Sequence, residues 1–379
     1  MSADVSVNTP ATRLATRLAF FAAGFIIACW APLVPYAKEN VGADEAQLGL
    51  LILCLGIGSI LAMPVTGVLS AKIGAKPIIV GSGTLIALFV PFLIIAQSPL
   101  FLGLALLCVG ASLGSLDVAM NVHAVEVEAA SDKPLMSGFH GMFSVGGFVG
   151  AGGVTLLLSL GLGPVAAVLV GSVVTLAAIL FAAPRLIAVR GGEPLKLVLP
   201  KGIVLLLASL AAVTFLTEGA LLDWGALLLL ERDLVGVEQA GIGYMLFAAA
   251  MTIGRLTGDR LVSALGGFRI LLWGGIAAVA GFVMILAMPG MVGVFSGFVL
   301  IGLGAANLVP VVFSAAGRQK VMPASLAIAA VTTTGYAGVL AGPALVGFVA
   351  HWSSLVGAFW MLAALMALVP VFSGKATRG

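Results

Sequence analysis

Apolar segments of about 20 residues, the length that a helix needs to cross the hydrocarbon core of a bilayer, recur along the whole chain. Twelve such segments, separated by short polar connections, would occupy most of the 379 residues. Only 9% of the residues are charged, against about 25% in ordinary soluble domains. We therefore predict an all-α, polytopic membrane protein with twelve transmembrane helices, which leaves no room for a water-soluble catalytic domain.

The predicted helices form two sets of six. The first set is expected at residues 17–37, 47–70, 77–97, 99–123, 136–160 and 163–183. The second set is expected at residues 203–229, 239–262, 269–288, 291–316, 324–350 and 354–373. The longest polar link lies between the sets, so the predicted organisation is a tail at 1–16, a bundle at 17–184, a linker at 185–201, a bundle at 202–373 and a tail at 374–379.

Basic residues set the predicted orientation. If the N-terminus is placed in the cytoplasm, all of the 18 Lys and Arg residues except Lys38 and Arg232 lie on the cytoplasmic side. Cytoplasmic loops of membrane proteins carry such an excess of basic residues. Residues 1–12 lack the pattern of a cleaved signal peptide, so the first apolar segment is expected to stay as a helix. The prediction is a monomeric, multi-pass protein of a bacterial inner membrane, with both termini in the cytoplasm.

The residue counts argue against several other functions. The charges are thinly spread, with a net charge of +3, so no nucleic-acid surface is indicated. Cys29, Cys54 and Cys108 all lie within apolar segments, and the three histidines are scattered. No disulfide, metal site or nucleophile–base pair is therefore expected. No G-x-x-x-x-G-K-[ST] motif occurs, so ATP drive is not predicted. No H-E-x-x-H motif or equivalent indicates an intramembrane enzyme, and no pattern indicates a cofactor.

Three pairs of segments repeat between the two halves. The pairs are residues 67–76 with 254–269, residues 114–117 with 304–307, and residues 146–150 with 338–342. Internal repeats of this kind are typical of secondary transporters, in which substrate binds near the middle of the membrane between the repeats. The two members of each pair lie at corresponding helices of the two sets of six. We therefore predict two pseudo-symmetric bundles.

The chain resembles the major facilitator superfamily over nearly its whole length. The superfamily signature G-x-x-x-D-R-x-G-R-R is matched after the second helix by Gly67, Lys72, Gly74 and Lys76, with Ala71 at the acidic position. A narrower resemblance, to the rhizopine-transporter-like or MosC-like branch, rests on residues 116–128, 136–140 and 218–224. That branch is related to the fucose permeases, so the resemblance implies a sugar-like or cyclitol-like substrate moved with protons.

Acidic residues at membrane depth are candidates for proton coupling. An acid at a helix centre costs about 2.5–3.5 kcal/mol on insertion scales, so Asp117, Glu218 and Asp223 are interpreted as functional residues. We expect no Lys or Arg at comparable depth to neutralise them. Glu218 is the first choice for the proton site, and a protonated Glu bonded to a carbonyl is the alternative. Asp223 faces the same cavity only if the helix bends at Gly219, and otherwise lies in an outer vestibule.

Polar and aromatic residues are candidates for substrate binding. Asp117 and Asn121 are four residues apart and share a helix face, and Asn307 occupies the matching place in the second half. These side chains would bind a hydroxylated solute, or alternatively form hydrogen bonds between helices. Aromatic rings can stack on the C–H groups of sugars. The aromatic candidates for substrate binding are therefore Trp30, Trp224 and Tyr336.

The second copy of the superfamily signature keeps its charges at Arg255, Asp259 and Arg260. The resemblance implies that these three residues, with Lys72 and Lys76, join helix ends in one state and release them in another. Simple anchoring of the loops in the cytoplasm is the alternative.

Histidines supply one further candidate for gating. His140 begins the fifth helix, where a pair with Asp117 or Glu126 would form a pH-sensitive inner gate. A position at the membrane interface is the alternative for His140, and it is the expectation for His123 and His351.

These observations together favour a secondary transporter that moves protons with a small polyhydroxylated solute across the lipid bilayer. Sodium in place of protons stays open, because a carboxylate and an Asn can ligate either ion. Proton-driven efflux of drug-like or sugar-like compounds is the alternative. Drug antiporters of the superfamily carry G-x-x-x-G-P in the fifth helix, whereas Ala151 follows Gly146 and Gly150 here, which disfavours efflux.

Overall fold

The computed structural model describes residues 7–131, 135–188 and 199–377, and within these residues the chain forms helices and no strands. The first half contains α1 (Pro10–Ala28), η1 (Ala31–Leu33), α2 (Val34–Val41), α3 (Glu45–Ile73), α4 (Ala75–Phe89), α5 (Phe92–Ile95), α6 (Pro99–Ala129), α7 (Met136–Ser159), α8 (Pro164–Ala182) and η2 (Ala183–Arg185). The second half contains α9 (Ile203–Glu231), η3 (Val237–Gln239), α10 (Ile242–Leu256), α11 (Gly258–Ala287), α12 (Gly290–Ala305), α13 (Leu308–Arg318), α14 (Ala324–Trp352), α15 (Leu355–Met366) and α16 (Leu368–Ala376). All twelve predicted segments are helical.

Several predicted spans are divided into two helices, and proline explains where. A proline lacks the N–H of the helical hydrogen bond, and its ring clashes with the carbonyl group four residues earlier. A proline lies four or five residues after the end of three helices that stop within a span: Pro32 after α1, Pro310 after α12 and Pro370 after α15. The spans expected at 17–37, 291–316 and 354–373 are therefore each built from two consecutive helical pieces.

Eleven helical segments of the described chain are long and apolar enough to cross a membrane. The one expected span outside these eleven, residues 239–262, corresponds to α10, which has only 15 residues. The first turns of α11 complete this span, because α11 is interrupted at Gly266, where φ is 78° and ψ is 157°. Gly74, at the corresponding turn of the first half, has nearly the same conformation, with φ 89° and ψ 162°. Only glycine adopts this region readily, so both repeats use the same turn.

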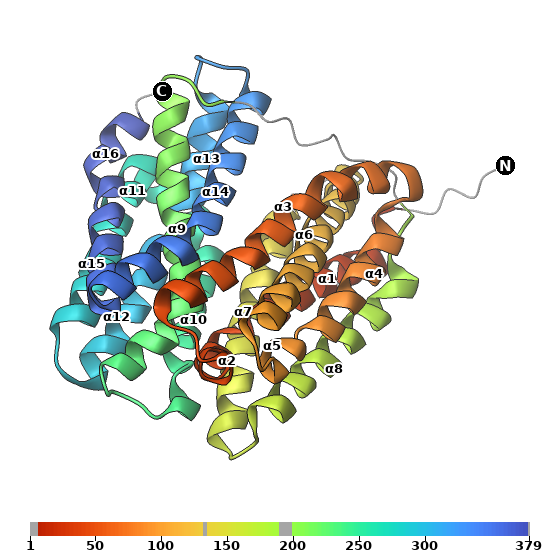
Figure 1. The fold of residues 1–379 in the computed structure, drawn as a ribbon. Coiled ribbons are helices and arrows are strands. Elements are labelled where there is room, and N and C mark those ends of the chain that lie inside the picture. The colour runs from red at the N-terminus through yellow and green to blue at the C-terminus, as the bar shows by residue number, and fades with distance from the viewer. Residues whose placement is uncertain (1–6, 132–134, 189–198, 378–379) are drawn as a thin grey trace. The chain divides into compact units, whose positions relative to one another are not determined.

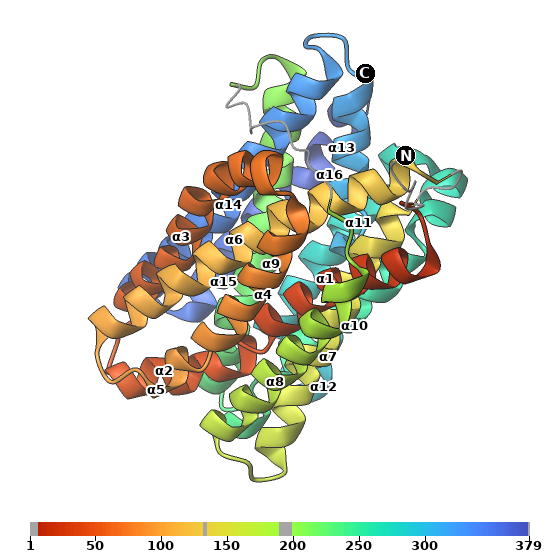
Figure 2. The same ribbon diagram turned by 90° about the vertical axis from the view of Figure 1, so that its right-hand side faces the viewer.

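The described residues divide into two compact units. The first unit lies within Met1–Gly42 and Cys54–Leu195, and the second within Ala43–Leu53 and Lys196–Gly379. In the first unit α1 packs along α7, and α4 packs along α6 (Figure 2). In the second unit the equivalent helices pair in the same way, α9 along α14 and α11 along α12 (Figure 1). The matching pairs confirm the predicted pseudo-symmetric repeat.

Glycines allow the paired helices to approach closely. A Cβ atom on Gly146 or Gly150 of α7 would overlap the backbone carbonyl oxygen of Phe21 or Phe25 in α1. A Cβ atom on Gly338 of α14 would likewise overlap the carbonyl oxygen of Ala212 in α9. The same small residues therefore set the helix spacing in both units.

Candidate functional site

An ion pair joins α9 to α10 inside the second unit. Nη2 of Arg255 donates to both carboxylate oxygens of Glu218, at 3.3 Å from Oε1 and 3.2 Å from Oε2. The side chains of Arg255 and Glu218 are 28% and 21% exposed. Glu218 lies near the middle of α9, whereas Arg255 lies in the last turn of α10, and a long Arg side chain can carry its charge away from its own backbone. The expectation that no Lys or Arg would neutralise Glu218 was therefore wrong.

The pair has two electrostatic states. Arg stays charged under all ordinary conditions, whereas a carboxylate can accept a proton. With Glu218 ionised, the guanidinium and the carboxylate attract each other across α9 and α10. With Glu218 protonated, most of this attraction is lost, so binding of one proton changes how strongly the two helices are joined.

Tyr244 belongs to the same group of residues and was not among the sequence candidates. Its hydroxyl lies within electrostatic reach of Glu218, Asp223 and Arg255. Tyr244 and Arg255 are eleven residues apart on α10, which places them about 20° apart around the helix at 100° per residue. That spacing is the signal in the sequence that could have identified Tyr244.

Asp223 is buried, with 7% of its surface exposed. It therefore does not lie in an open outer vestibule. Helix α9 continues without a break through Gly219. Asp223 and Glu218 both lie within electrostatic reach of Tyr244 in α10.

The aromatic candidates differ in exposure. Tyr336 of α14 is 38% exposed and stacks on Phe215 of α9, with ring centroids 6.5 Å apart and an angle of 15° between the planes. Phe215 precedes Glu218 by three residues, so this aromatic pair lies next to the ion pair along α9. Trp30 and Trp224 are 1% and 0% exposed. Only Tyr336 of the three predicted aromatic residues therefore offers ring surface to a solute.

Asp117 and Asn121 form the polar candidate of the first unit. Nδ2 of Asn121 donates to the backbone carbonyl of Asp117 at 2.9 Å and to its Oδ1 at 3.3 Å. Both side chains lie on one face of α6 and are partly exposed. A hydroxyl group could bind to this face through the carboxylate and the amide together.

Asn307 occupies a different environment from Asn121. It is 8% exposed and lies in the break between α12 and α13, where its Nδ2 donates to the carbonyl of Gly254 at 3.0 Å. Its Oδ1 lies where a Cβ atom on Gly258 would stand. The amide of Asn307 thus joins the ends of three helices, which is the alternative that the sequence left open, and we do not include it in the proposed binding surface.

Replacement of Asn307 with Ala should therefore lower the melting temperature of the purified protein. The change removes the shorter of two side-chain hydrogen bonds to the Gly254 carbonyl, which also accepts from Oγ1 of Thr257 at 3.3 Å. Loss of such a hydrogen bond costs about 1 kcal/mol. Any stabilisation by a bound solute should persist, because Asn307 has no part in binding. A variant that keeps its melting temperature but loses the solute-induced increase would show that Asn307 binds the solute.

The predicted gating residues are only partly described. Lys72 is in the last turn of α3, Lys76 is in the first turn of α4, and Arg260 is exposed on α11. The side chain of Asp259 lies outside the described part of the structure. The ring of His140 is exposed and packs edge-on against Phe20, with centroids 5.0 Å apart. A pair of His140 with Asp117 or Glu126 stays a prediction.

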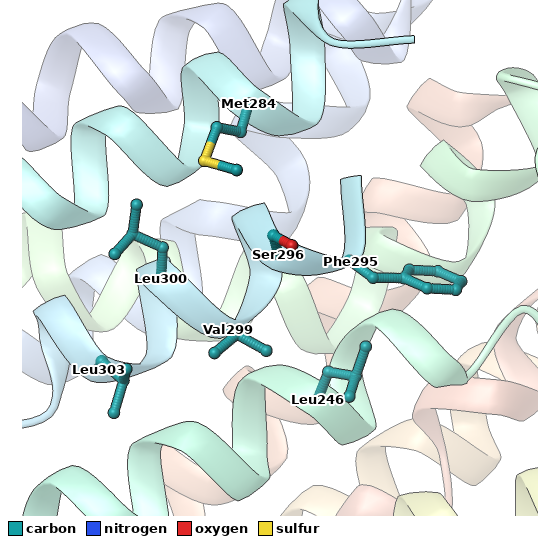
Figure 3. A pocket seen from close by; sticks show the side chains of 7 residues that line it. All are labelled: Leu246, Met284, Phe295, Ser296, Val299, Leu300 and Leu303. Carbon is teal, nitrogen blue, oxygen red and sulfur yellow. The ribbon is translucent and has the colours of Figure 1, made fainter. Parts of the chain in front are cut away.

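An open apolar hollow of about 400 Å³ lies on the second unit, between α10, α11 and α12 (Figure 3). Its lining consists of Leu246, Met284, Phe295, Ser296, Val299, Leu300 and Leu303. Ser296 supplies the one side-chain hydroxyl of this lining. The hollow suits hydrocarbon better than a polyhydroxylated solute, so it is not our candidate binding site.

A profile of the Major Facilitator Superfamily matches residues 17–325. The chain belongs to the major facilitator superfamily. It shares 48% identity over 369 residues with an uncharacterized MFS-type transporter of Yersinia pestis, covering 97% of this chain and 96% of the relative. It is also 30% identical over 365 residues to the membrane protein MosC of Rhizobium meliloti, covering 94% of this chain and 88% of MosC. The predicted resemblance to the MosC-like branch is confirmed.

The fold agrees with this membership of the major facilitator superfamily. The nucleoside transporter NupG superposes with a TM-score of 0.78, covering 97% of this chain and all of NupG, at 12% identity. That similarity establishes the fold of the superfamily. The protein is thus a multi-pass transporter of the lipid bilayer that binds a small molecule, and not an enzyme.

Proposed function

We propose that this transporter moves protons together with a small polyhydroxylated solute, a sugar or a cyclitol. The observation that carries the proposal is the partly exposed Glu218–Arg255 pair between α9 and α10. Ionisable residues within membrane spans are costly and mark proton or substrate pathways. A carboxylate that alternates between a guanidinium partner and a bound proton can couple proton movement to a change in helix packing.

The proposed cycle begins when Glu218 takes up a proton from the outer side. The neutral carboxyl no longer attracts Arg255, so α9 and α10 can change their packing while solute is bound. Loss of the proton to the cytoplasm restores the ion pair and resets the carrier. Asp117 and Asp223 are further candidates for holding a proton. Binding of a sodium ion by the carboxylates, in place of a proton, is the alternative that the experiment must distinguish.

Each unit, taken by itself, offers side chains that we propose for solute binding. Asp117 and Asn121 offer a carboxylate and an amide for hydroxyl groups, and Tyr336, stacked on Phe215, offers a ring face for C–H groups. The proposal places the protein in a bacterial inner membrane with both termini in the cytoplasm. The distribution of Lys and Arg supports this orientation.

A thermal-shift screen tests the proposal, because a ligand that binds only the folded state raises its apparent stability. The panel contains sugars, cyclitols, amino sugars and hydrophobic cations, at pH 5.5 and 7.5. We expect one polyol family to raise the melting temperature of the wild type, with a pH dependence that is absent in Glu218→Gln. The exposed carboxylate variant Glu39→Gln is the matched control and should behave like the wild type.

Two results of the screen would count against the proposal. Stabilisation by hydrophobic cations alone would favour proton-driven efflux. An identical pH dependence in the wild type and in Glu218→Gln would remove Glu218 from the coupling step. Repeating the screen with sodium chloride replaced by choline chloride distinguishes sodium coupling, which would make the stabilisation depend on sodium.

A further inference from the structure

His123 was expected at the membrane interface, but this expectation was wrong. Its side chain is 0% exposed in α6, and both ring nitrogens have partners from other parts of the first unit. Nδ1 is 3.1 Å from Oγ1 of Thr16 in α1. Nε2 accepts a hydrogen bond of 3.1 Å from the backbone N–H of Ile187. One side chain therefore joins α6, α1 and the segment that follows η2.

The donors in this chain of hydrogen bonds can be assigned from its two ends. The hydroxyl of Thr16 donates to the carbonyl of Thr12 at 2.9 Å, so Oγ1 of Thr16 accepts from Nδ1 of His123. At the other end, a backbone N–H can only donate, so Nε2 of His123 must be the acceptor. This pattern requires a neutral imidazole with its proton on Nδ1. A second proton, on Nε2, would break the bond to Ile187 and bury a charge.

The hydrogen bond from Ile187 to His123 lies at the start of the linker between the bundles. Ile187 follows the end of η2 by two residues, and the chain then continues into the linker that joins the two bundles. Leu186 is buried beside it, whereas Ala188 is exposed. Lys76 of α4 is the charged group within electrostatic reach of the His123 ring. Within the described residues, which end at Ala188 at this point of the chain, the bond therefore holds the start of the linker to the first unit.

We propose that His123 is a positioning residue that fastens the start of the inter-bundle linker to the first bundle through its neutral Nδ1–H tautomer. The bond to Thr16 orients the ring, and the bond to Ile187 holds the linker. Loss of the second bond alone would free the described residues that follow η2 from their attachment to the first bundle. The fastening is a property of the first unit and is independent of proton coupling at Glu218.

Two substitutions of His123 separate its two bonds. In His123→Asn the side-chain amide can replace Nδ1 as donor to Thr16 but is too short to reach Ile187. In His123→Gln the carbonyl oxygen extends to the place of Nε2 and can accept from Ile187. Hydrogen–deuterium exchange of the full-length protein in nanodiscs then measures the Ile187 amide, with the α8 amides as internal reference.

We expect the Ile187 amide to exchange at least tenfold faster in His123→Asn, with α8 unchanged. Exchange in His123→Gln and in Thr16→Val should stay within threefold of the wild type. Unchanged protection of Ile187 in His123→Asn would overturn the proposal. Faster exchange of Ile187 and α8 together in Thr16→Val and His123→Asn would also overturn it, because His123 would then act only in core packing.

A second measurement needs no substitution of His123. The chain has three histidines, so ¹⁵N NMR of histidine-labelled protein gives few signals, and His140→Gln and His351→Gln identify those of the other two. At pH 7.5 we expect a neutral His123 ring with its proton on Nδ1. A proton on Nε2, or a doubly protonated ring, would contradict the assigned hydrogen bonds and the proposal.

Discussion

Replacement of Arg255 with Met should lower the melting temperature of the purified protein more at pH 8 than at pH 5.5. The variant leaves the Glu218 carboxylate without its guanidinium partner, and removal of one member of a buried ion pair costs about 3–5 kcal/mol. Because the pair is 21–28% exposed, we expect a smaller loss, of about 2 kcal/mol, at pH 8. At pH 5.5 Glu218 can take up a proton, which removes the unpaired charge and part of the loss.

The double variant Arg255→Met/Glu218→Gln is the control for this expectation. It has no unpaired charge, so its melting temperature should be higher than that of Arg255→Met at pH 8 and nearly independent of pH. Its proton-driven transport should nevertheless be lost, because no carboxylate remains at this position. Equal losses of stability at both pH values in Arg255→Met would show that the Arg side chain acts through packing and not through its charge.

Replacement of Gly146 with Ala should destabilise the first unit strongly. The added Cβ would overlap the carbonyl oxygen of Phe21 and stand 2.8 Å from the backbone nitrogen of Phe25. Backbone atoms cannot move aside as a flexible side chain can, so α1 and α7 must separate. We expect a loss on the order of 3 kcal/mol, at the upper end of the usual range for overpacking, and a lower yield of folded protein.

Gly147 supplies the matched control for Gly146. A Cβ on Gly147 would meet no atom within 4 Å, and Ala is favoured over Gly within a helix. Gly147→Ala should therefore keep or slightly raise the melting temperature, which fluorescence-detected size-exclusion chromatography after heating measures. Equal stability of the two variants would mean that α1 and α7 are not held together by close backbone contact.

Much of the fold could be predicted because one physical requirement determines it. A bilayer demands long apolar helices, and their positions are visible directly in the sequence. The divided helices were not predicted, although Pro310 and Pro370 were visible, because a proline can also be accommodated within a helix. Pro64 and Pro343 are examples, since each lies inside a continuous helix.

The candidate site was predicted less completely, because side-chain reach and burial depend on packing. Arg255 was assigned to a cytoplasmic turn from its place in the chain, but its side chain extends inward to Glu218. Trp224 was a candidate for stacking on a sugar, yet it is fully buried. His123 was misplaced for the same reason, since helix periodicity does not reveal which neighbours cover a given face.

Solute-dependent proton movement tests the central proposal most directly. Proteoliposomes that contain a pH-sensitive dye are mixed with each solute of the panel, with wild-type protein, Glu218→Gln or Glu39→Gln. We predict that one family of polyols acidifies the lumen with wild type and Glu39→Gln, and that Glu218→Gln gives no acidification. Uptake of a polyol without proton movement, or acidification that persists in Glu218→Gln, would contradict coupling at the Glu218–Arg255 pair.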